Sequence, residues 1–395
     1  DLHLSIRRQR QMCIRDRHLS EEQTAFYDLA KDFALKKMAP NAEKWDEDKI
    51  FPVETLKELA SLGFGGIYVD PNLGGSGLSR LDASLIFEAL SQGCTSTSAF
   101  LSIHNMANWM IDSFGSNELK ERFVPDLCSM NKIASYCLTE AGAGSDAGNL
   151  KTKAKKDGDY YIVNGTKSFI SGGGYSDIYV TMVRTGDDSA SGISTLLIEK
   201  DSPGLSFGAQ EKKMGWNSQP TAQVIFEDCK VPVKNIIGSE GDGFKIAMKG
   251  LDGGRLNIAA CSLGTAQSAF EKAVEYAGDR EQFGKKIQDF QSIQFKLADM
   301  ATELEASRLM LRDAAGKVDQ NTTDKTKAAA MAKRFVTDKC FNIVNEALQI
   351  HGGYGYLKDY PLERNLRDVR VHQILEGTNE IMNVIISREI LKENR

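Results

Sequence analysis

The chain has 395 residues, of which 26% are charged and 41% hydrophobic, and its net charge is −5 at pH 7. This length and balance are typical of a globular protein with two or three domains and large cores. The sequence has no run of about 18 apolar residues, which excludes a membrane-spanning helix. It has no basic, aromatic-interleaved stripe, which argues against a nucleic-acid-binding protein.

The first 18 residues differ from the rest of the chain. They contain five arginines, two aspartates and no lysine, and the chain does not begin with methionine. One interpretation is the tail of an Arg-rich organelle presequence. The interpretation we favour is a non-native stretch, since residues 11–17 resemble translated adapter sequence. We therefore leave residues 1–18 out of the predicted fold.

A helical region is predicted over residues 19–133. Ser20 followed by Gln23 fits a capping box that opens a helix. The apolar residues behind it indicate an amphipathic helix, and they are Phe26, Leu29, Phe33 and Leu35. Helical patterns resume over residues 81–130, so the first domain reads as all helical.

The hydrophobic period changes at about residue 134, and a compact β domain is predicted over residues 134–243. Residues 160–163 and 166–170 read as two strands joined by a hairpin turn at Asn164-Gly165. Further strands are predicted at residues 178–184, 193–199 and 223–229, with Gly, Ser, Asp and Pro between them.

Helices return over residues 244–395. Two apolar stripes indicate the core of a helix bundle: one holds Ile293, Leu297, Met300, Leu304 and Leu311, the other Phe335, Ile343, Ala347 and Ile350. Gly352-Gly353 is predicted to end the second helix.

Cysteines and histidines show no metal or disulfide pattern. The seven cysteines are scattered and form no Cys-x-x-Cys pair, which is typical of reduced thiols. His104, His351 and His372 lack metal-ligand spacing, so we expect them to be structural.

The segment Ile374–Glu380 carries the strongest functional signal. It places a carboxylate, Glu376, two residues before a good helix N-cap, Thr378, with Gly377 between them. A glutamate there can act as a base, while backbone N–H groups at the helix start face a developing negative oxygen. Removal of a proton next to a carbonyl needs this pairing, although a solvated cap has the same pattern.

The order of helical, β and helical regions, together with five motifs, resembles the acyl-CoA dehydrogenase family over residues 19–395. The motifs are residues 136–146 (Tyr-Cys-Leu-Thr-Glu-Ala-Gly-Ala-Gly-Ser-Asp), 169–171 (Phe-Ile-Ser), 279–284 (Asp-Arg-Glu-Gln-Phe-Gly), 349–355 (Gln-Ile-His-Gly-Gly-Tyr-Gly) and the Glu376 segment. The resemblance implies an α+β fold with an N-terminal helical domain (19–133), a middle β-barrel-like domain (134–243) and a C-terminal four-helix bundle (244–395).

The resemblance also implies FAD as cofactor. The FAD-binding positions it gives are Tyr136, Cys137, Leu138, Thr139, Glu140, Ala141, Gly142, Ala143, Gly144, Ser145, Phe169, Ile170, Ser171, Arg280, Phe290, Gln291, Gln349, Ile350, His351, Gly352, Gly353, Thr378, Asn379 and Glu380. Ser171 is expected to bond flavin N5, and Phe169 stands where many relatives have tryptophan. Arg280 and residues 349–353 are expected to reach FAD bound in a neighbouring subunit.

Residues 142–147 also match the dinucleotide fingerprint G-x-G-x-x-G/A. That motif binds phosphate only between a strand and a helix. Here a Lys-rich stretch leads into strands. We therefore interpret these residues as an open loop whose amides face a flavin.

The resemblance assigns the base. Most members use the glutamate before Gly-Thr/Ser, but some use a residue before the arginine of an earlier L-x-x-x-R segment. In this chain the earlier segment is Leu251–Arg255 with Gly254 at that site, which leaves Glu376 as the base. The family's substrate-contacting positions correspond to Ser145, Asp252, Gly253, Gly254, Arg255, Gly377 and Arg388.

The implied reaction is α,β-dehydrogenation of a short branched acyl-CoA, isobutyryl-CoA to methacrylyl-CoA. Glu376 removes the α-proton while flavin N5 takes the β-hydride, and burial is expected to raise the pKa of Glu376. Asn105, Met106, Trp109 and the Leu251–Gly254 turn are candidates for shaping the acyl pocket. The resemblance further implies electron-transfer flavoprotein as acceptor, a homotetramer and the mitochondrial matrix.

Alternatives remain open from the sequence. The acyl group could be 2-methylbutyryl or a straight short chain. Less favoured alternatives are an acyl-CoA oxidase and a non-catalytic assembly protein that keeps the fold, and an intact Glu376 argues against the second.

Overall fold

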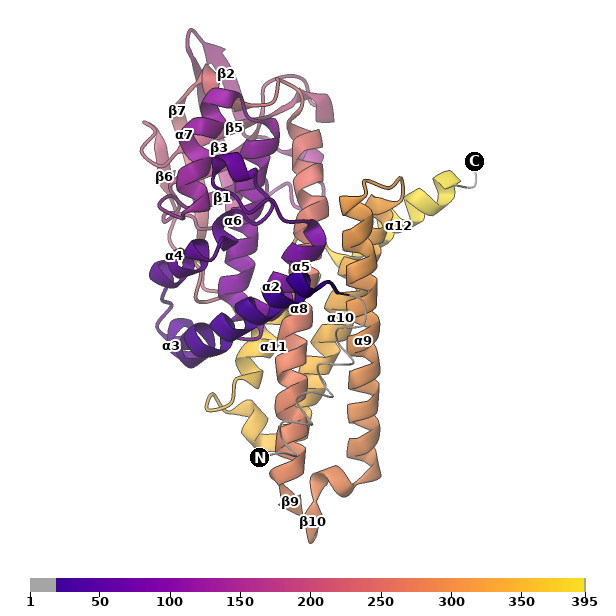
Figure 1. Ribbon diagram of the computed structural model, residues 1–395. Coiled ribbons are helices and arrows are strands. Elements are labelled where there is room, and N and C mark those ends of the chain that lie inside the picture. Colours follow the sequence, from indigo (N-terminus) through magenta and orange to yellow (C-terminus); the bar gives the residue numbers. More distant parts are fainter. Residues whose placement is uncertain (1–18, 394–395) are drawn as a thin grey trace.

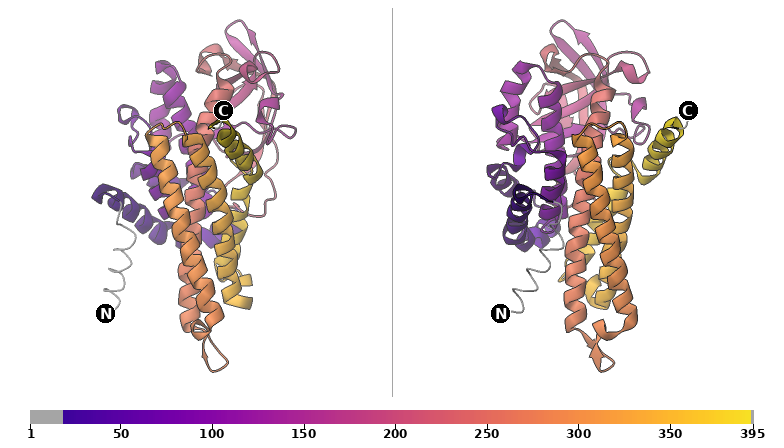
Figure 2. Two further views of the ribbon diagram at one scale, coloured as in Figure 1. Left: turned by 90° about the vertical axis from the view of Figure 1, so that its right-hand side faces the viewer. Right: turned by 45° about the vertical axis from the view of Figure 1, so that its right-hand side comes forward.

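The computed structural model describes residues 19–393. The interpretation of residues 1–18 lies outside the described residues. Three long helices form one half of the molecule, and a sheet with flanking N-terminal helices forms the other half (Figure 1). The two rotated views show the long helices standing side by side below the sheet (Figure 2).

The N-terminal region is helical, as predicted. Its α-helices are α2 (Glu21–Phe33), α3 (Ala42–Glu47), α4 (Val53–Ser61), α5 (Arg80–Ser91), α6 (Thr95–Phe114) and α7 (Asn117–Cys128). The Ser20–Gln23 capping box is confirmed, because each side chain bonds the other residue's backbone N–H.

The predicted apolar face of α2 is partly wrong. Leu29 and Leu35 are exposed, whereas Ala30, Ala34 and Met38 are buried. Ala30 lies in α2, which packs against α5, and Ala34 and Met38 lie four and eight positions later in the π-helical turn Ala34–Met38 that continues the helix. Small alanines let the two helices approach closely, so residue size, and not hydrophobicity alone, selected the buried face.

The middle region is one eight-stranded sheet. Its strands are β1 (Ala134–Cys137), β2 (Lys153–Asp157), β3 (Tyr160–Ser171), β4 (Ile178–Arg184), β5 (Ile193–Glu199), β6 (Leu205–Phe207), β7 (Thr221–Pro232) and β8 (Ile236–Ile237). The strand order is β6-β7-β3-β2-β4-β5-β8, with β1 paired to β4. The sheet curls around a core shared by β3, β4, β5 and β7, which gives the barrel-like form, although β6 and β8 leave the path open.

The predicted hairpin at Asn164-Gly165 is wrong. Residues 160–171 form one continuous strand, β3, and the tight turn is at Gly158-Asp159, because Asp157 pairs with Tyr160. At Asn164 the β3–β7 pairing has a bulge, where the Asn164 amide donates to the Asp228 carboxylate at 3.0 Å and its oxygen accepts from Asp228 N at 2.9 Å. An Asn-Gly pair therefore marks a bulge here and not a chain reversal.

The C-terminal region is the predicted helical bundle. Its helices are α8 (Gly243–Asp279), α9 (Gln291–Asp319), α10 (Lys325–His351), α11 (Leu362–Arg370) and α12 (Asn379–Glu393), and a small hairpin, β9 (Glu281–Gln282) with β10 (Lys285–Lys286), joins α8 to α9. Within the two predicted stripes, the buried residues are Met300, Leu304, Leu311, Ile343, Ala347 and Ile350. Gly352 ends α10 with φ +58°, as predicted.

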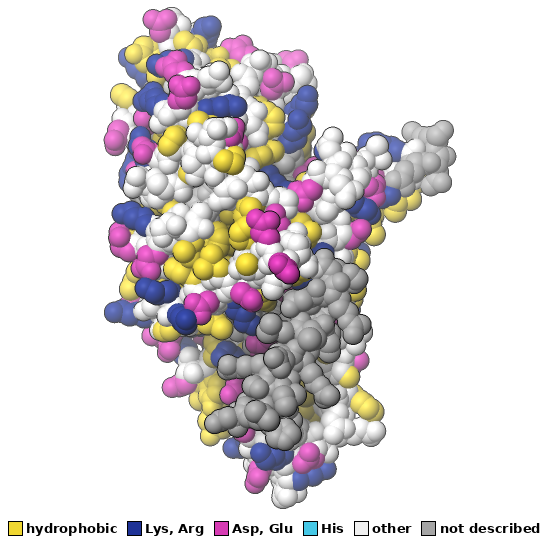
Figure 3. All heavy atoms as spheres, in the orientation of Figure 1, with side chains coloured by type: hydrophobic (Ala, Val, Ile, Leu, Met, Phe, Trp, Pro, Cys, Tyr) yellow, Lys and Arg dark blue, Asp and Glu magenta, His cyan; other side chains and the backbone are white. Residues whose placement is uncertain are grey.

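The surface carries mixed charge. On the face shown in Figure 3, lysines and arginines alternate with aspartates and glutamates. Among residues 19–393, no helix is long and apolar enough to cross a membrane. The six cysteines in this part of the chain are all free and buried.

Candidate active site

The Glu376 segment adopts a rare backbone conformation. Glu376 has φ +57° and Gly377 has φ +87°, so two successive residues lie in the left-handed region. Thr378 then accepts a hydrogen bond from Ile381 N at 3.3 Å, which confirms it as the cap of α12. A left-handed non-glycine residue persists only where its surroundings impose it, and such residues cluster at functional sites.

The carboxyl group of Glu376 lies directly against Gly254 on α8. A Cβ atom at residue 254 would lie 2.5 Å from Glu376 Oε2 and 2.9 Å from its Cδ. A side chain at residue 254 and the carboxyl of Glu376 therefore compete for one space. The predicted turn at residues 251–254 is wrong, because these residues are helical within α8.

Glu376 as a whole is half-buried, and the buried oxygen of its carboxyl is unbonded. Glu376 Oε2 has no contact with solvent and no hydrogen-bond partner among the described residues. Burial raises the pKa of Glu376 to about 7, against the opposing charges of Arg255 and Lys333. The group can therefore take or release a proton near neutral pH, as a general base requires.

Two predicted substrate residues on α8 act together: Arg255 bonds the Glu376 segment, and Asp252 bonds Arg255. Arg255 Nε donates to the Glu376 carbonyl oxygen at 3.3 Å, and its Nη1 bonds the Asp252 carboxylate at 2.7 Å. Arg255 is buried, and its guanidinium bonds the backbone carbonyl of Glu376.

Aromatic side chains lie near this carboxyl; Tyr136 and Trp109 were predicted site residues, whereas Tyr68 and Arg80 were missed. Burial raises the pKa of the Tyr136 hydroxyl well above its ordinary value, and the charge of Glu376 adds to that effect. The Tyr136 hydroxyl has no partner among residues 19–393. Arg80 stacks on Tyr68 and on Trp109, with its guanidinium carbon 3.6 and 4.8 Å from the two ring centres.

The 136–145 loop and the end of β3 are joined into one unit. Ser168 N donates to the Thr139 carbonyl at 2.8 Å, and Ser135 Oγ donates to the Ser171 carbonyl at 2.6 Å. Glu140 and Ala143 exchange both backbone hydrogen bonds, which makes a tight turn. The loop is followed by a short 3₁₀ turn and then β2, so the dinucleotide-type fingerprint has no helix behind it.

Phe169 stands out on this unit. It lies in a β-bulge with φ +59°, and 66% of its surface is exposed. Gly142 and Gly144 also face open space, since a Cβ at either position would meet nothing within 4 Å. Cys137 and Ile170 point instead into the core of the sheet, so only their backbone can contribute to a site.

Glu140 has a structural side chain. Its carboxylate accepts from Lys167 Nζ at 2.8 Å, from Lys151 N at 2.6 Å and from Thr152 N at 2.9 Å. Both of its oxygens are thus bonded, in contrast with those of Glu376.

A second set of predicted residues lies at the other end of the bundle. Arg280 and Gln291 are exposed beside the β9–β10 hairpin, with Phe290 half-buried, and Gln349, Gly352 and Gly353 are exposed at the end of α10. Arg280 lies over the Tyr354 ring, 5.6 Å from its centre, which brings these two groups together. The 25 residues of α8 between Gly254 and Arg280 correspond to roughly 40 Å of helix.

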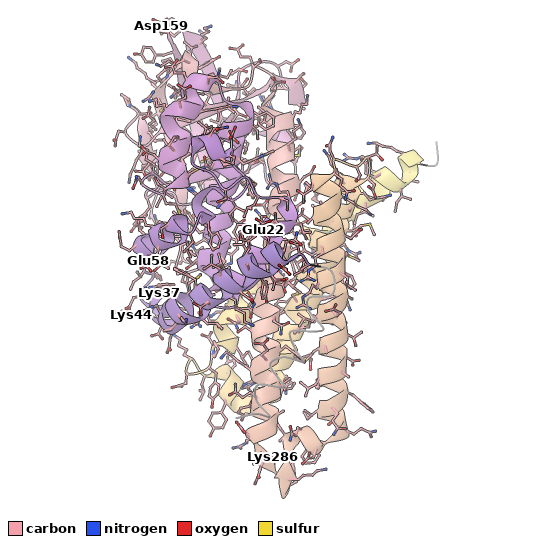
Figure 4. The ribbon with its side chains drawn as sticks, in the orientation of Figure 1. Glu22, Lys37, Lys44, Glu58, Asp159 and Lys286 are labelled. Atoms are coloured by element: carbon pink, nitrogen blue, oxygen red, sulfur yellow. The ribbon has the colours of Figure 1, made fainter. Side chains whose placement is uncertain are left out.

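Figure 4 shows the two ends of the molecule. Asp159, in the β2–β3 turn, and Lys286, in the β9–β10 hairpin, lie at opposite ends of the molecule. The structure therefore does not bring the two sets of predicted cofactor residues together within one chain.

Some predicted residues lie elsewhere. Arg388 is exposed on α12, where it pairs with Glu389 at 3.2 Å. Asn379 is buried and bonds Thr337 and Asp338, while Glu380 is exposed and Ser145 lies on the open loop. Ile350 and His351 are buried; the His351 ring stacks on Tyr276.

Two of the candidates for shaping an acyl pocket are wrong. Asn105 is fully buried, accepting from Ile67 N at 2.8 Å and donating to Phe64 O at 2.9 Å, so its amide braces the N-terminal helices. Met106 lies in the core between α6 and the sheet. Trp109 is half-buried beside Arg80 and remains a candidate.

The histidines have structural partners. His104 lies between Leu127 O and Ala134 N, at 2.9 and 3.1 Å. His372 bonds Ser262 and accepts from the Trp216 indole. No group of three or more potential metal ligands occurs in the described part of the chain.

Fold and site together define a class: a protein with a helical domain, a β domain and a helix bundle, in which a carboxyl of raised pKa lies against the longest helix. Family models match all three parts: "Acyl-CoA dehydrogenase, N-terminal domain" over residues 20–131, the middle domain over 135–229 and the C-terminal domain over 241–391. The chain therefore belongs to the acyl-CoA dehydrogenase family, whose members are flavin-dependent oxidoreductases.

Individual relatives agree over nearly the whole chain. The chain is 58% identical over 375 residues to the mitochondrial isobutyryl-CoA dehydrogenase of Bos taurus, covering 95% of this chain and 90% of the relative. It is also 58% identical to the Dictyostelium discoideum isobutyryl-CoA dehydrogenase, covering 95% and 91%. The solved structure of Megasphaera elsdenii butyryl-CoA dehydrogenase superposes with a TM-score of 0.92 at 40% identity, covering 95% of this chain and all of the other.

Proposed function

We propose that the protein catalyses FAD-dependent α,β-dehydrogenation of short branched acyl-CoA thioesters, converting isobutyryl-CoA to methacrylyl-CoA in valine catabolism. The observation that carries this proposal is the Glu376 carboxyl, buried against Gly254 with one oxygen unbonded and a pKa of about 7. Such a group is matched to removing the weakly acidic α-proton of a thioester.

The chain's own residues supply the base and the alignment. Glu376 takes the α-proton, while its backbone N–H, at the start of the left-handed pair, donates to the thioester oxygen. The 3.3 Å bond from Arg255 to the Glu376 carbonyl holds the next peptide unit, 376–377, and so fixes the backbone on the other side of the Glu376 Cα. Glu376 is half-buried, which limits the access of water and strengthens both interactions. When bound, FAD supplies the ring that accepts the β-hydride.

The residues of the sheet fit a flavin. An exposed aromatic ring, Phe169, offers a π-face, and Ser171 offers a hydroxyl two residues later. The open space at Gly142 and Gly144 leaves backbone groups of the 136–145 loop accessible to a cofactor. Thr378, Asn379 and Glu380 complete the proposed cofactor contacts at the start of α12.

The distant set of residues supports a shared cofactor. Arg280, Phe290, Gln291 and residues 349–353 gather at the far end of α8, where they cannot reach the loop of their own chain. A guanidinium is suited to a pyrophosphate, because it donates two parallel charge-assisted bonds. We therefore propose a homotetramer in which this end of one chain contacts FAD bound by another.

The substrate class rests on the relatives. Identity of 58% to isobutyryl-CoA dehydrogenases from a mammal and an amoeba supports a short branched acyl group. Ser145, Asp252, Gly253, Gly254, Arg255, Gly377 and Arg388 are the proposed substrate-contacting residues. Mitochondrial relatives support a mitochondrial matrix location, and electron-transfer flavoprotein is the proposed electron acceptor.

The test is Glu376→Gln, mixed anaerobically with isobutyryl-CoA while flavin absorbance is followed. We expect retained yellow colour and ligand binding, with bleaching slowed about 10²- to 10⁴-fold because the base is gone. Glu118→Gln, which changes an exposed glutamate on α7, should bleach at the wild-type rate. Bleaching of Glu376→Gln at the wild-type rate would overturn the proposal.

Competitive turnover separates the substrate alternatives. Isobutyryl-, 2-methylbutyryl- and butyryl-CoA should differ in kcat/KM, since one methylene is worth about 1–3 kcal/mol of discrimination. Equal rates would defeat the isobutyryl assignment. Hydrogen peroxide formed as fast as product would identify an oxidase instead.

A further inference from the structure

Lys333 is a buried cation that the proposed reaction does not use. It lies on α10 with no exposed surface, in a helix face whose other members are Ala329, Val336 and Cys340. Burial lowers its pKa to about 8, against the opposing charge of Glu376. Burying a charged lysine in an apolar helix face costs free energy unless hydrogen-bond partners compensate for the lost water.

Those partners are all in the Glu376 segment. Lys333 Nζ donates to the Gly377 carbonyl and to the Asn379 side-chain oxygen, both at 2.8 Å. It makes no bond to the Glu376 carboxylate, whose Oε2 stays unbonded. The ammonium therefore holds the backbone next to the base and leaves the base itself available.

The bond to Gly377 acts where the backbone is most constrained. Glu376 and Gly377 both have positive φ, at +57° and +87°. Arg255 from α8 holds the first carbonyl of this pair, and Lys333 from α10 holds the second. Two cations on two helices thus fix two successive carbonyls and with them the direction of the Glu376 side chain.

Anchoring of α12 alone does not require Lys333. The Asn379 amide already donates to Thr337 Oγ1 at 3.0 Å and to the Asp338 carboxylate at 2.7 Å, and both acceptors are on α10. What Lys333 adds is the Gly377 contact and a positive charge near Glu376.

Other ionisable groups also face this carboxyl. Arg255 approaches from α8, Tyr136 from β1, and Tyr68 from the turn after Phe64–Gly66. Of these, only Arg255 joins Lys333 in opposing the effect of burial on the pKa of Glu376.

We propose that Lys333 is a positioning residue for Glu376: it fixes the left-handed 376–377 backbone through the Gly377 carbonyl and supplies a positive charge that favours the ionised base. This inference rests on the proposed function of Glu376. It assigns a role in the reaction to a residue on a different helix, 43 positions earlier in the chain.

Two variants separate the bond from the charge. Lys333→Met removes both, and we expect proton abstraction to slow about 10- to 100-fold. Lys333→Gln keeps a donor for Gly377 without the charge, and we expect it to recover most of that rate. In both variants the midpoint of the acid limb, in a plot of kcat/KM against pH, should move to higher pH by about 0.5–1 unit. The reason is that the ionised carboxylate of Glu376 loses a favourable positive neighbour.

A second readout needs no turnover. An infrared titration of the Glu376 carboxyl band, assigned by its loss in Glu376→Gln, should show the same upward shift in the absence of substrate. The control is Lys339→Met, which removes an ion pair with Glu303 between α10 and α9 and should leave the pH limb unmoved.

Folded Lys333 variants with wild-type rate and an unmoved limb would overturn the inference while the proposed function stands. Slower turnover with no shift in either the acid limb or the infrared band would also overturn the inference, because that result identifies Lys333 as purely structural. Failure of both variants to fold would also overturn it. A wild-type flavoprotein whose flavin is not reduced by isobutyryl-, 2-methylbutyryl- or butyryl-CoA would instead defeat the proposed function.

Discussion

Two lysine–glutamate neighbourhoods are buried in the described part of the chain, and they differ in where the hydrogen bonds go. In the sheet, Lys167 bonds the Glu140 carboxylate directly at 2.8 Å, and two backbone amides complete its bonding. In the bundle, Lys333 bonds the backbone beside Glu376 and leaves one carboxyl oxygen unbonded.

The difference shows in the charge state. Although burial opposes ionisation, the charge of Lys167 and the hydrogen bonds to the carboxylate lower the pKa of Glu140. Burial prevails at Glu376 and raises its pKa to about 7. The same two residue types thus make a permanent ion pair that joins β3 to the loop in one place, and a group able to exchange a proton in the other.

Glu140→Gln tests the first half of this comparison. It leaves Lys167 as a buried cation without its counter-ion, so we expect the free energy of unfolding to fall by about 3–5 kcal/mol. Urea unfolding of the purified protein measures this change. A loss below about 1 kcal/mol would show that Glu140 is not the structural partner described here.

Glu376→Gln should change stability in the opposite direction. The pKa of Glu376 is raised in the folded state, so ionising it costs stability as pH rises from the unfolded pKa to about 7. The neutral amide avoids that cost, and we expect a gain of about 1–3 kcal/mol at pH 8 that falls below about 1 kcal/mol near pH 5. Unfolding at both pH values checks it, and destabilisation at pH 8 equal to that of Glu140→Gln would break the comparison.

Gly254→Ala tests the Glu376 side of this comparison, because it moves the Glu376 carboxyl without removing it. The new methyl would lie 2.5 Å from Glu376 Oε2, so the flexible carboxyl must turn away. We expect flavin reduction to slow about 10- to 100-fold, with stability unchanged or up to about 1 kcal/mol higher because alanine favours the helix.

Gly316→Ala on α9 is the matched control for Gly254→Ala. Its Cβ meets nothing within 4 Å, so it should give the helix gain alone and the wild-type rate. A wild-type rate in Gly254→Ala as well would contradict the placement of Glu376.

Signals that act within a few residues predicted the fold well. The Ser20–Gln23 cap, the helix end at Gly352, and the strands at 178–184 and 193–199 match the structure. Asn164-Gly165 misled the prediction because the choice between hairpin and bulge depends on β7, which lies about 60 residues later. The buried face of α2 likewise depends on the shape of α5.

The site was predictable where the residues themselves carry the chemistry. Glu376 before a helix cap, and Gly254 on the earlier segment, came from motifs and resemblance, and the structure brings the two into contact. Lys333, Tyr68 and Arg80 were missed because their roles depend on tertiary packing. One signal for Lys333 was available: a lone lysine among alanines and valine on one face of α10.

The central claim is that the buried carboxyl of Glu376 must lose its proton before it can act as the base. The most direct measurement is kcat/KM for isobutyryl-CoA between about pH 5 and pH 9, because its acid limb reports the pKa of the free protein's base. The account predicts a limb with a midpoint near 7 in wild type that is absent from the residual rate of Glu376→Gln. A flat profile across this range, or the same limb in both proteins, would contradict it.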